Sequence, residues 1–227
     1  HHPVSGGHRN PAGPSLVYLM LQLVNVSLSV FDRTILDRAQ LQLRSGDIVL
    51  LDGPTRSGKT QLLRLLAGIL RPQEGQLLLR GKAAGYHPGR RFFAQRQDIC
   101  CLFRRLEPLH ALTCQENLEL ILRLGTAMNR PKIEREINSR LSQLGLMERK
   151  YTRVEDLSVS EKIRLRLALC SRPGSSIFLL DQILHDADEA TREAGLAWIK
   201  ELLKSAAIIV LTPEDQARLE LPVNRRI

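Results

Sequence analysis

Apolar runs and leucines at helical spacing alternate along this chain of 227 residues. The alternation of apolar and polar positions from residue 17 to residue 30 predicts strands. Further strands are predicted by short apolar runs at 47–51, 76–80, 99–103, 177–180 and 207–211. Helices are predicted by apolar positions at helical spacing in 59–70, 116–124, 131–144, 161–171 and 187–203.

Strands and helices alternate near both ends of the chain, and a block of helices lies between them. This order predicts an α/β core with an inserted helical subdomain. Four segments are expected: a flexible tail rich in His, Gly and Pro (1–15), the first part of the core (16–104), the helical subdomain (105–171) and the second part of the core (172–227).

The composition is that of a soluble globular chain, with 43% hydrophobic and 25% charged residues, which excludes disorder of the whole chain. The net charge of +9 favours an acidic partner: a nucleotide, a nucleic acid or an anionic membrane surface. Residues 71–105 hold eight basic and two acidic residues, which fits either a solvated face or a contact surface. Aromatic residues make up only 4% and form no stacking array, which disfavours a nucleic-acid partner.

No apolar run reaches the ~18 residues that a membrane-spanning helix needs, and no signal peptide is recognisable. The four cysteines lack the spacing of a metal site, and we expect them to be buried thiols in a reducing compartment. The chain is therefore expected to reach a membrane only through a partner.

A glycine-rich segment between a predicted strand and a predicted helix reads GPTRSGKT, which fits the phosphate-loop pattern G-x-x-x-x-G-K-[ST]. Its backbone N–H groups would cradle phosphate oxygens, Lys59 would reach the β- and γ-phosphates, and the Thr60 hydroxyl would bind Mg²⁺. Arg56 leaves open a relic loop that no longer binds, because a bulky residue stands where glycine freedom is favoured. The candidate nucleotide-binding residues of this loop are Gly53, Pro54, Thr55, Arg56, Ser57, Gly58, Lys59 and Thr60.

A second motif with the same chemistry is the apolar run IFLLD, which ends in Asp181. A carboxylate at the end of a buried strand supplies a second anchor for the magnesium ion. ATP and Mg²⁺ are therefore the expected cofactors, with Thr60 and Asp181 as the metal-binding residues.

With these motifs in place, residues 16–227 resemble the nucleotide-binding subunit of an ABC transporter. The segment 61–81 (QLLRLLAGILRPQEGQLLLRG) is similar to the stretch after the family's phosphate loop, and 112–118 (LTCQENL) resembles its LTVxENL segment. Ser158 lies where the signature LSGGQ begins, and Asp188 falls at the D-loop aspartate. Phe31 takes the place of the aromatic residue that stacks on adenine, although it could equally be a core phenylalanine.

The resemblance implies a P-loop NTPase (RecA-like) core with an antiparallel β edge and an inserted helical subdomain. It implies pairing with a second copy or a homologous subunit, so that ATP lies between one phosphate loop and the partner's Ser158 and Ser160 signature. It also implies a membrane-spanning partner subunit and a cytoplasmic position, peripheral on the inner face of a membrane. The basic side chains that would meet an acidic partner helix or lipid headgroups are Arg90, Arg91, Arg104 and Arg105.

Four elements depart from the family pattern. Arg104 takes the place of the glutamine-loop Gln, and an arginine cannot ligate a cation. Residues 157–161 read LSVSE, so a β-branched side chain and a carboxylate replace a glycine and the glutamine of the signature. Gln182 stands at the catalytic glutamate, and an amide cannot accept a proton as a general base near neutral pH. Pro213 stands where a histidine would contact the γ-phosphate.

These departures predict an ATP-binding subunit with weak or no hydrolysis, because the binding residues of the phosphate loop and Asp181 are kept. Replacing the catalytic Glu by Gln is a familiar way of trapping ATP, but it would explain Gln182 alone. Two alternatives stay open. One is an active ATPase half of a heterodimeric ABC transporter, and the other is a soluble P-loop regulatory protein.

Overall fold

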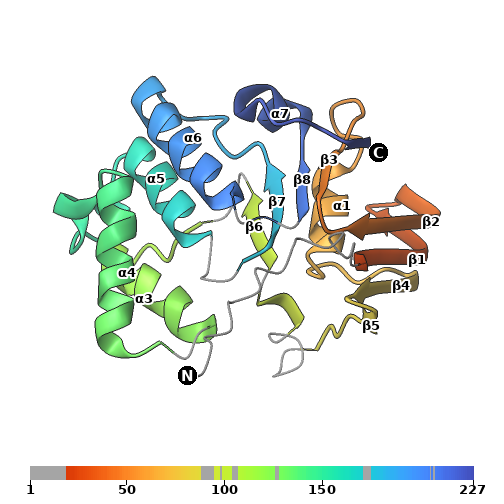
Figure 1. Cartoon of the computed structure of the whole chain (residues 1–227), viewed down its shortest axis with the longest axis horizontal. Coiled ribbons are helices and arrows are strands. Elements are labelled where there is room, and N and C mark those ends of the chain that lie inside the picture. Colours follow the sequence, from red (N-terminus) through yellow and green to blue (C-terminus); the bar gives the residue numbers. More distant parts are fainter. Residues whose placement is uncertain are drawn as a thin grey trace, which may run out of the picture.

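The computed structural model describes residues 19–87, 95–97, 99–103, 107–125, 128–170, 175–204, 206 and 208–227. Within these ranges two β-sheets stand beside a group of helices (Figure 1). The tail predicted at 1–15 lies outside the described residues. The same holds for four of the basic side chains named above, Arg90, Arg91, Arg104 and Arg105.

The core sheet is parallel throughout and has the strand order β6-β7-β8-β3-β9. Its strands are β3 (Asp47–Leu50), β6 (Ile99–Phe103), β7 (Ile177–Asp181), β8 (Ile208–Leu211) and β9 (Arg225–Arg226). Every residue of β7 and β8 is buried, as expected for parallel strands that are covered on both faces. The apolar runs that predicted four of these strands are thereby confirmed.

The second sheet is antiparallel, with the strand order β2-β1-β4-β5. It consists of β1 (Leu19–Val30), β2 (Arg33–Arg44), β4 (Glu74–Leu79) and β5 (Lys82–Ala83). Strands β1 and β2 are joined at Phe31 and Asp32, whose φ angles of 49° and 58° suit a two-residue type I′ hairpin turn. The sequence pattern did not predict β2, because nearly all of its residues are at least partly exposed.

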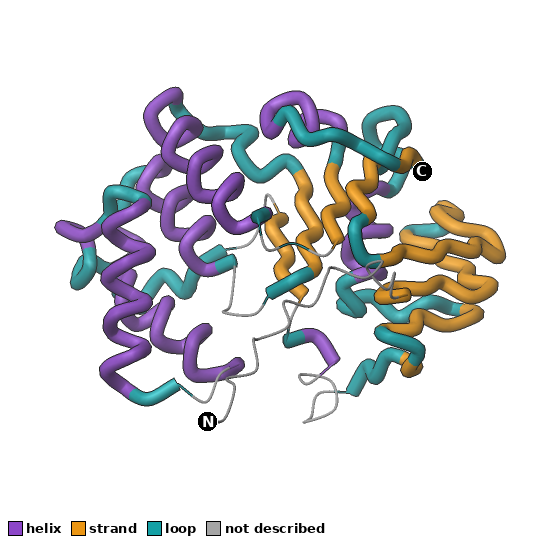
Figure 2. Tube along the Cα trace, viewed as in Figure 1, coloured by secondary structure: helices purple, strands orange, loops and turns teal. Residues whose placement is uncertain are grey.

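The helices are α1 (Lys59–Leu66), α3 (Cys114–Gly125), α4 (Arg130–Gln143), α5 (Val159–Leu169), α6 (Glu189–Leu203) and α7 (Pro213–Leu219), with short 3₁₀ turns at Met147–Arg149 and Val154–Asp156. Figure 2 shows α3 to α6 gathered on one side of the core strands, with the antiparallel sheet on the other. Helix α1 ends before the predicted limit of residue 70, because Gly68 turns into the left-handed region (φ 67°) and its N–H bonds the Leu65 carbonyl. Helix α7 was not predicted.

Two clusters of buried apolar side chains hold these layers together. In one, Phe178 and Leu180 on one face of the core sheet pack with the helical group, including Trp198. In the other, Leu63 of α1 packs with the antiparallel sheet and with Leu179 on the opposite face. Helix α1 therefore lies between the two sheets. The expected burial of thiols is confirmed at Cys100, Cys114 and Cys170, whereas Cys101 is half-buried.

A basic side chain inside residues 71–105 has a structural role. The Arg96 guanidinium is buried and donates hydrogen bonds to the carbonyls of Ala67 (3.1 Å), Gly68 (3.0 Å) and Gly85 (2.9 Å). It thereby binds the end of α1 to the segment after β5. The expectation that this stretch forms one basic face is wrong for Arg96.

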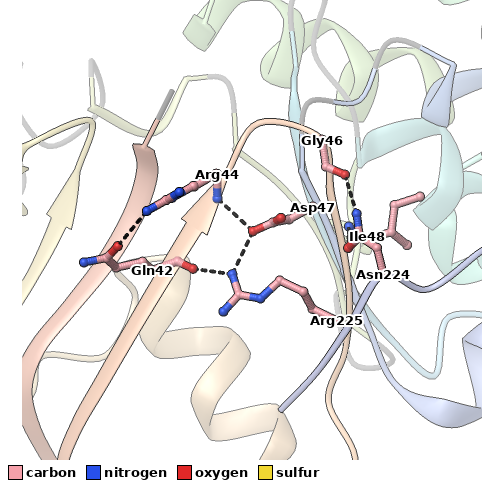
Figure 3. A network of polar contacts seen from close by, with 7 residues as sticks. All are labelled: Gln42, Arg44, Gly46, Asp47, Ile48, Asn224 and Arg225. Atoms are coloured by element: carbon pink, nitrogen blue, oxygen red, sulfur yellow. Dashed lines mark hydrogen bonds and ion pairs between the residues drawn. The ribbon is translucent and has the colours of Figure 1, made fainter. Parts of the chain in front are cut away.

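The C-terminal segment is tied to both sheets by a polar network (Figure 3). The Arg225 guanidinium donates to the Asp47 carboxylate at 2.8 Å and to the Gln42 carbonyl of β2. The Asn224 side chain accepts a hydrogen bond from the Ile48 N–H at 2.9 Å. Because these residues come from β2, β3 and the segment 224–225, the network fixes the antiparallel sheet against the core sheet.

A matched pair of glycines tests the packing between β1 and β4. Gly75 and Gly81 share a φ of 74°, but a Cβ at Gly75 would lie 2.2 Å from the Asn25 carbonyl oxygen, whereas one at Gly81 meets nothing within 4 Å. Gly81→Ala should therefore cost only the ~1–2 kcal/mol of a left-handed L-residue. Gly75→Ala should lower the free energy of unfolding by clearly more. Urea denaturation of both variants measures the two losses. Equal losses would contradict the close approach of the two strands.

Candidate functional site

A cavity of about 290 Å³ opens where β3 and β7 end and α1 begins. Its described lining is Val30, Ile35, Thr55, Arg56, Ser57, Gly58, Lys59, Thr60, Gln61, Asp181, Gln182 and Glu214. The phosphate-loop pattern and the apolar run that ends in Asp181 therefore meet in space, although more than a hundred residues separate them in sequence. A crevice at the carboxyl ends of parallel strands is the usual place for a ligand in such sheets.

The phosphate loop is closed on itself by Lys59. Its ammonium group donates hydrogen bonds to the carbonyls of Gly53 (2.8 Å) and Pro54 (3.1 Å). Gly58 has a φ of 104°, and a Cβ there would lie 2.5 Å from the Ile35 side chain, so only glycine fits. Arg56 has a φ of 65°, a strained conformation for a non-glycine residue that costs about 1–3 kcal/mol and that clusters at ligand sites.

The two proposed magnesium anchors are in direct contact. The Thr60 hydroxyl donates to Oδ2 of Asp181 at 2.7 Å. Burial raises the pKa of Asp181, the Thr60 hydrogen bond lowers it, and the charge of Glu214 raises it again. Hydroxyl and carboxylate oxygens are the donors that Mg²⁺ prefers, so this pair fits the ion that the phosphate loop requires.

Gln182 follows Asp181 in a left-handed conformation with a φ of 51°. Its N–H donates to Oδ2 of Asp215 at 2.7 Å, and the N–H of Ile183 donates to Oδ1 at 3.1 Å. The Thr212 hydroxyl donates to the same carboxylate at 2.8 Å. Burial raises the pKa of Asp215, and these three hydrogen bonds oppose that rise. The sequence reasoning missed Asp215, although the T-x-x-D spacing from Thr212 is a helix-capping pattern.

The signature segment begins α5 with a reciprocal cap. The Ser158 hydroxyl accepts from the Glu161 N–H at 3.2 Å, and the Glu161 carboxylate accepts from the Ser158 N–H at 2.8 Å. Arg149 donates to the same carboxylate at 2.8 Å, and the pKa of Glu161 is lowered by the Ser158 N–H and by Arg149. The Glu161 carboxylate is therefore paired at the start of the helix. Val159 is 68% exposed.

Ser160 and Asp188 join the starts of α5 and α6. The Ser160 hydroxyl donates to the Asp188 carboxylate, which also accepts from the Thr191 N–H at 2.7 Å as the N-cap of α6. These hydrogen bonds lower the pKa of Asp188 to about 2. The described lining of the phosphate-loop cavity includes neither Ser158 nor Ser160.

Phe31 projects from the turn between β1 and β2 and is 98% exposed. The alternative that it is a core residue is therefore wrong. Val30 and Ile35, on either side of it, both line the cavity. Contact with adenine stays a prediction for this residue.

The described residues also bear on metal binding and on membrane crossing. The described ranges hold no group of three or more His, Cys, Asp or Glu side chains that could bind a metal ion. Among the described helices, none has both the length and the apolar character that crossing a bilayer requires.

Comparison with known proteins places these features in a family. Residues 36–185 match the sequence profile of ABC transporters. A thiamine import ATP-binding protein ThiQ of Vibrio vulnificus (strain YJ016) is 31% identical over 172 residues, 75% of this chain and 70% of that protein. A spermidine/putrescine import ATP-binding protein PotA of Bacteroides fragilis is 26% identical over 89% of this chain, but the match spans only 43% of its own length.

Solved structures share the fold. The ATP-binding cassette MJ0796, in a dimeric post-hydrolysis state with ADP and Pi, superposes with a TM-score of 0.75 at 22% identity, covering 88% of this chain and 90% of that one. The cbiO1 structure from Clostridium perfringens gives 0.66 at 18% identity over 86% of this chain and 78% of that chain. The predicted P-loop core with an antiparallel β sheet is thereby confirmed.

The lowered pKa of Asp188 predicts a pH-dependent contribution to stability. Because its folded pKa of about 2 lies below its usual value near 3.8, its stabilisation is full above about pH 4 and lost as the pH falls to 2. Asp188→Ala should therefore lower the free energy of unfolding at pH 6, and its difference from the unaltered chain should shrink towards pH 2. Urea unfolding from pH 2 to 6 measures this, with the exposed Glu193→Ala as the control. A difference that does not vary with pH would exclude these hydrogen bonds as the cause.

Proposed function

The chain belongs to the ABC transporter family, and on that premise we propose that it is the ATP-binding subunit of an ABC-type membrane transporter complex. The observation that carries this proposal is the cavity at which the phosphate loop, Asp181 and Gln182 converge. It offers backbone N–H groups at a helix start, the ammonium group of Lys59 and a hydroxyl–carboxylate pair, which together suit a nucleoside triphosphate with its metal ion.

The residues of this chain would hold Mg-ATP as follows. Lys59, whose ammonium group donates to the carbonyls of Gly53 and Pro54, would contact the β- and γ-phosphates instead. Thr60 and Asp181 would hold Mg²⁺, which when bound would neutralise charge on the phosphate oxygens. Phe31 stacks on the adenine ring. The loop residues from Gly53 to Gly58 wrap the phosphates with their N–H groups.

Uptake is the direction of transport that we propose. The relatives in thiamine, spermidine/putrescine, sulfate/thiosulfate and iron(III) systems are all import ATP-binding proteins. Because their cargoes differ, no one solute is favoured for this chain. The location that follows is cytoplasmic, on the inner face of a membrane and attached through a membrane-spanning subunit.

We further propose that two ATP-binding subunits close around ATP, either two copies of this chain or this chain and a homologue. Support comes from the position of Ser158 and Ser160, which start α5 away from the cavity of their own chain. A partner's signature would complete the site from the opposite side. The division into an ATP-binding core (16–104 and 172–227) and a signature subdomain (105–171) belongs to this proposal.

Weak hydrolysis is the final part of the proposal. Gln182 lines the cavity with an amide that cannot act as a general base near neutral pH. Pro213 is the first residue of α7, a position that suits proline but offers no polar contact to a phosphate. Arg104, at the position of the glutamine-loop Gln, lies outside the described residues. A heterodimeric transporter in which a partner supplies the missing groups is the second candidate, and the LTCQENL and signature-like segments argue against a soluble regulator.

The central test of ATP binding is Lys59→Ala. Losing a charged hydrogen bond to phosphate costs about 1.5–3 kcal/mol, so the affinity for Mg-ATP should fall about 10- to 100-fold in isothermal titration calorimetry. Lys200→Ala, at an exposed lysine of α6, should leave the affinity unchanged. The turnover of the unaltered chain should stay well below ~1 s⁻¹, the lower end of typical enzymes. Turnover above that value that depends on Lys59 would contradict weak hydrolysis.

The role of Phe31 can be separated from that of the phosphate loop. Stacking of a base on an aromatic side chain contributes about 1–3 kcal/mol, so Phe31→Ala should weaken ATP binding by about 5- to 100-fold, whereas Phe31→Trp should retain it. Inorganic triphosphate lacks the base, and its affinity should be the same for all three chains. Equal losses for ATP and triphosphate would show that Phe31 acts on the loop and not on adenine.

A further inference from the structure

The cavity contains a carboxylate whose role the family pattern does not supply. The positions that correspond to the catalytic glutamate and the switch histidine hold neutral side chains, Gln182 and Pro213. Glu214, the next residue along the chain, lines the same cavity. Among the described lining residues, Asp181 and Glu214 are the two carboxylates, and Asp181 is engaged by the Thr60 hydroxyl.

The start of α7 holds the backbone of Glu214 in a defined position. Pro213 opens α7 with a φ set by its ring, and the buried Thr212 hydroxyl bonds Asp215 across this first turn. The Asp215 carboxylate also accepts the N–H of Gln182 at 2.7 Å, so the start of α7 is fastened to the end of β7. The backbone of Glu214 is therefore held next to the residues that follow the strand.

The carboxylate of Glu214 lies near Asp181 in the cavity. It is one of the causes that raise the pKa of Asp181, so the two carboxylates interact across the cavity. The side chain is exposed to solvent. In the part of the chain that the structure describes, no hydrogen bond or ion pair engages its carboxylate. A solvent-accessible anion that faces the phosphate site is available to accept a proton.

We propose that Glu214 is the general base of the slow ATP hydrolysis by this chain, in place of the residue at position 182; this rests on the proposed function. The oxygen of a water molecule bonds the γ-phosphorus, and the bond from that phosphorus to the oxygen bridging the β-phosphate breaks. The electron pair leaves with ADP. Glu214 takes the proton of the attacking water and returns it to solvent, so the products are ADP and inorganic phosphate. The Gln182 amide helps to orient the water.

The test compares kcat and nucleotide affinity for the full chain. Glu214→Gln keeps the shape of the side chain and removes the base, so kcat should fall about 10²-fold or more, towards the background of Lys59→Ala. The affinity for ATP should stay equal or tighten a few-fold relative to ADP, because a negative charge facing the γ-phosphate is gone. The matched control is Glu193→Gln, an exposed glutamate of α6 that does not line the cavity and should change neither quantity.

Two further measurements isolate proton transfer. In a Gln182→Glu background, where a second carboxylate supplies the base, Glu214→Gln should lower kcat by less than about threefold, since the two groups would be redundant. For Glu214→Ala, added formate should restore part of kcat without changing ATP affinity. A change in ATP affinity with kcat intact would assign Glu214 an electrostatic role in binding and overturn the proposal.

The outcomes also separate this proposal from the one it rests on. Equal kcat for the unaltered chain and Glu214→Gln would overturn the role of Glu214 and leave ATP binding in place. If ATP is bound but no turnover depends on Lys59, the role of Glu214 would likewise be overturned and ATP binding would stand. If the unaltered chain failed to bind ATP, the proposed function itself would be wrong.

Discussion

The parallel register of the core sheet is the constraint on which the site depends. Leu50, Leu180 and Leu211 lie side by side across β3, β7 and β8, so the three strands end in one line. Whatever follows each strand must then converge at that edge: the phosphate loop, Asp181 with Gln182, and Thr212 with the start of α7. A shift of one residue in β7 would exchange the side chains on its two faces, which pack against different clusters: Phe178 and Leu180 against the helical group, and Leu179 against α1 and the antiparallel sheet. The register is therefore specified by what each face packs against.

Two carboxylates, Asp215 and Asp188, attach neighbouring helices to the segments that follow the core strands. Asp215 connects β8 and α7 to the turn after β7, and its burial means that removing a partner would leave a desolvated charge. Asp188 connects the starts of α5 and α6, so the signature segment is positioned by the helix that follows the same turn. The turn after β7 is therefore hydrogen-bonded to the start of α7 through Gln182 and Ile183, and Asp188, further along the same segment, is hydrogen-bonded to the signature.

Sequence patterns predicted the elements whose burial is one-sided or complete. The strands at 47–51 and 177–180 and the helices at 131–144 and 187–203 appear with small shifts at their ends. The strand β2 was not predicted because nearly all of its residues are at least partly exposed. Helix α7 was not predicted because its seven residues contain too few apolar positions to show a helical period. At the site, the phosphate loop and Asp181 were found by motif. Asp215 and Glu214 were not predicted. They reach the site because Asp215 is hydrogen-bonded to the turn after β7, and this contact between distant segments has no periodic signal in the sequence.

Two of the departures from the family pattern have a local physical reason in the fold. Glu161 completes the reciprocal cap of α5, and Pro213 occupies the first position of α7, where a missing N–H breaks no hydrogen bond within the helix. Each residue stabilises a helix start at a position where the family's residue would face a ligand. Under the proposed function, nucleotide binding depends on the phosphate loop and Asp181, and Glu214, at a position next to Pro213, supplies the base for hydrolysis.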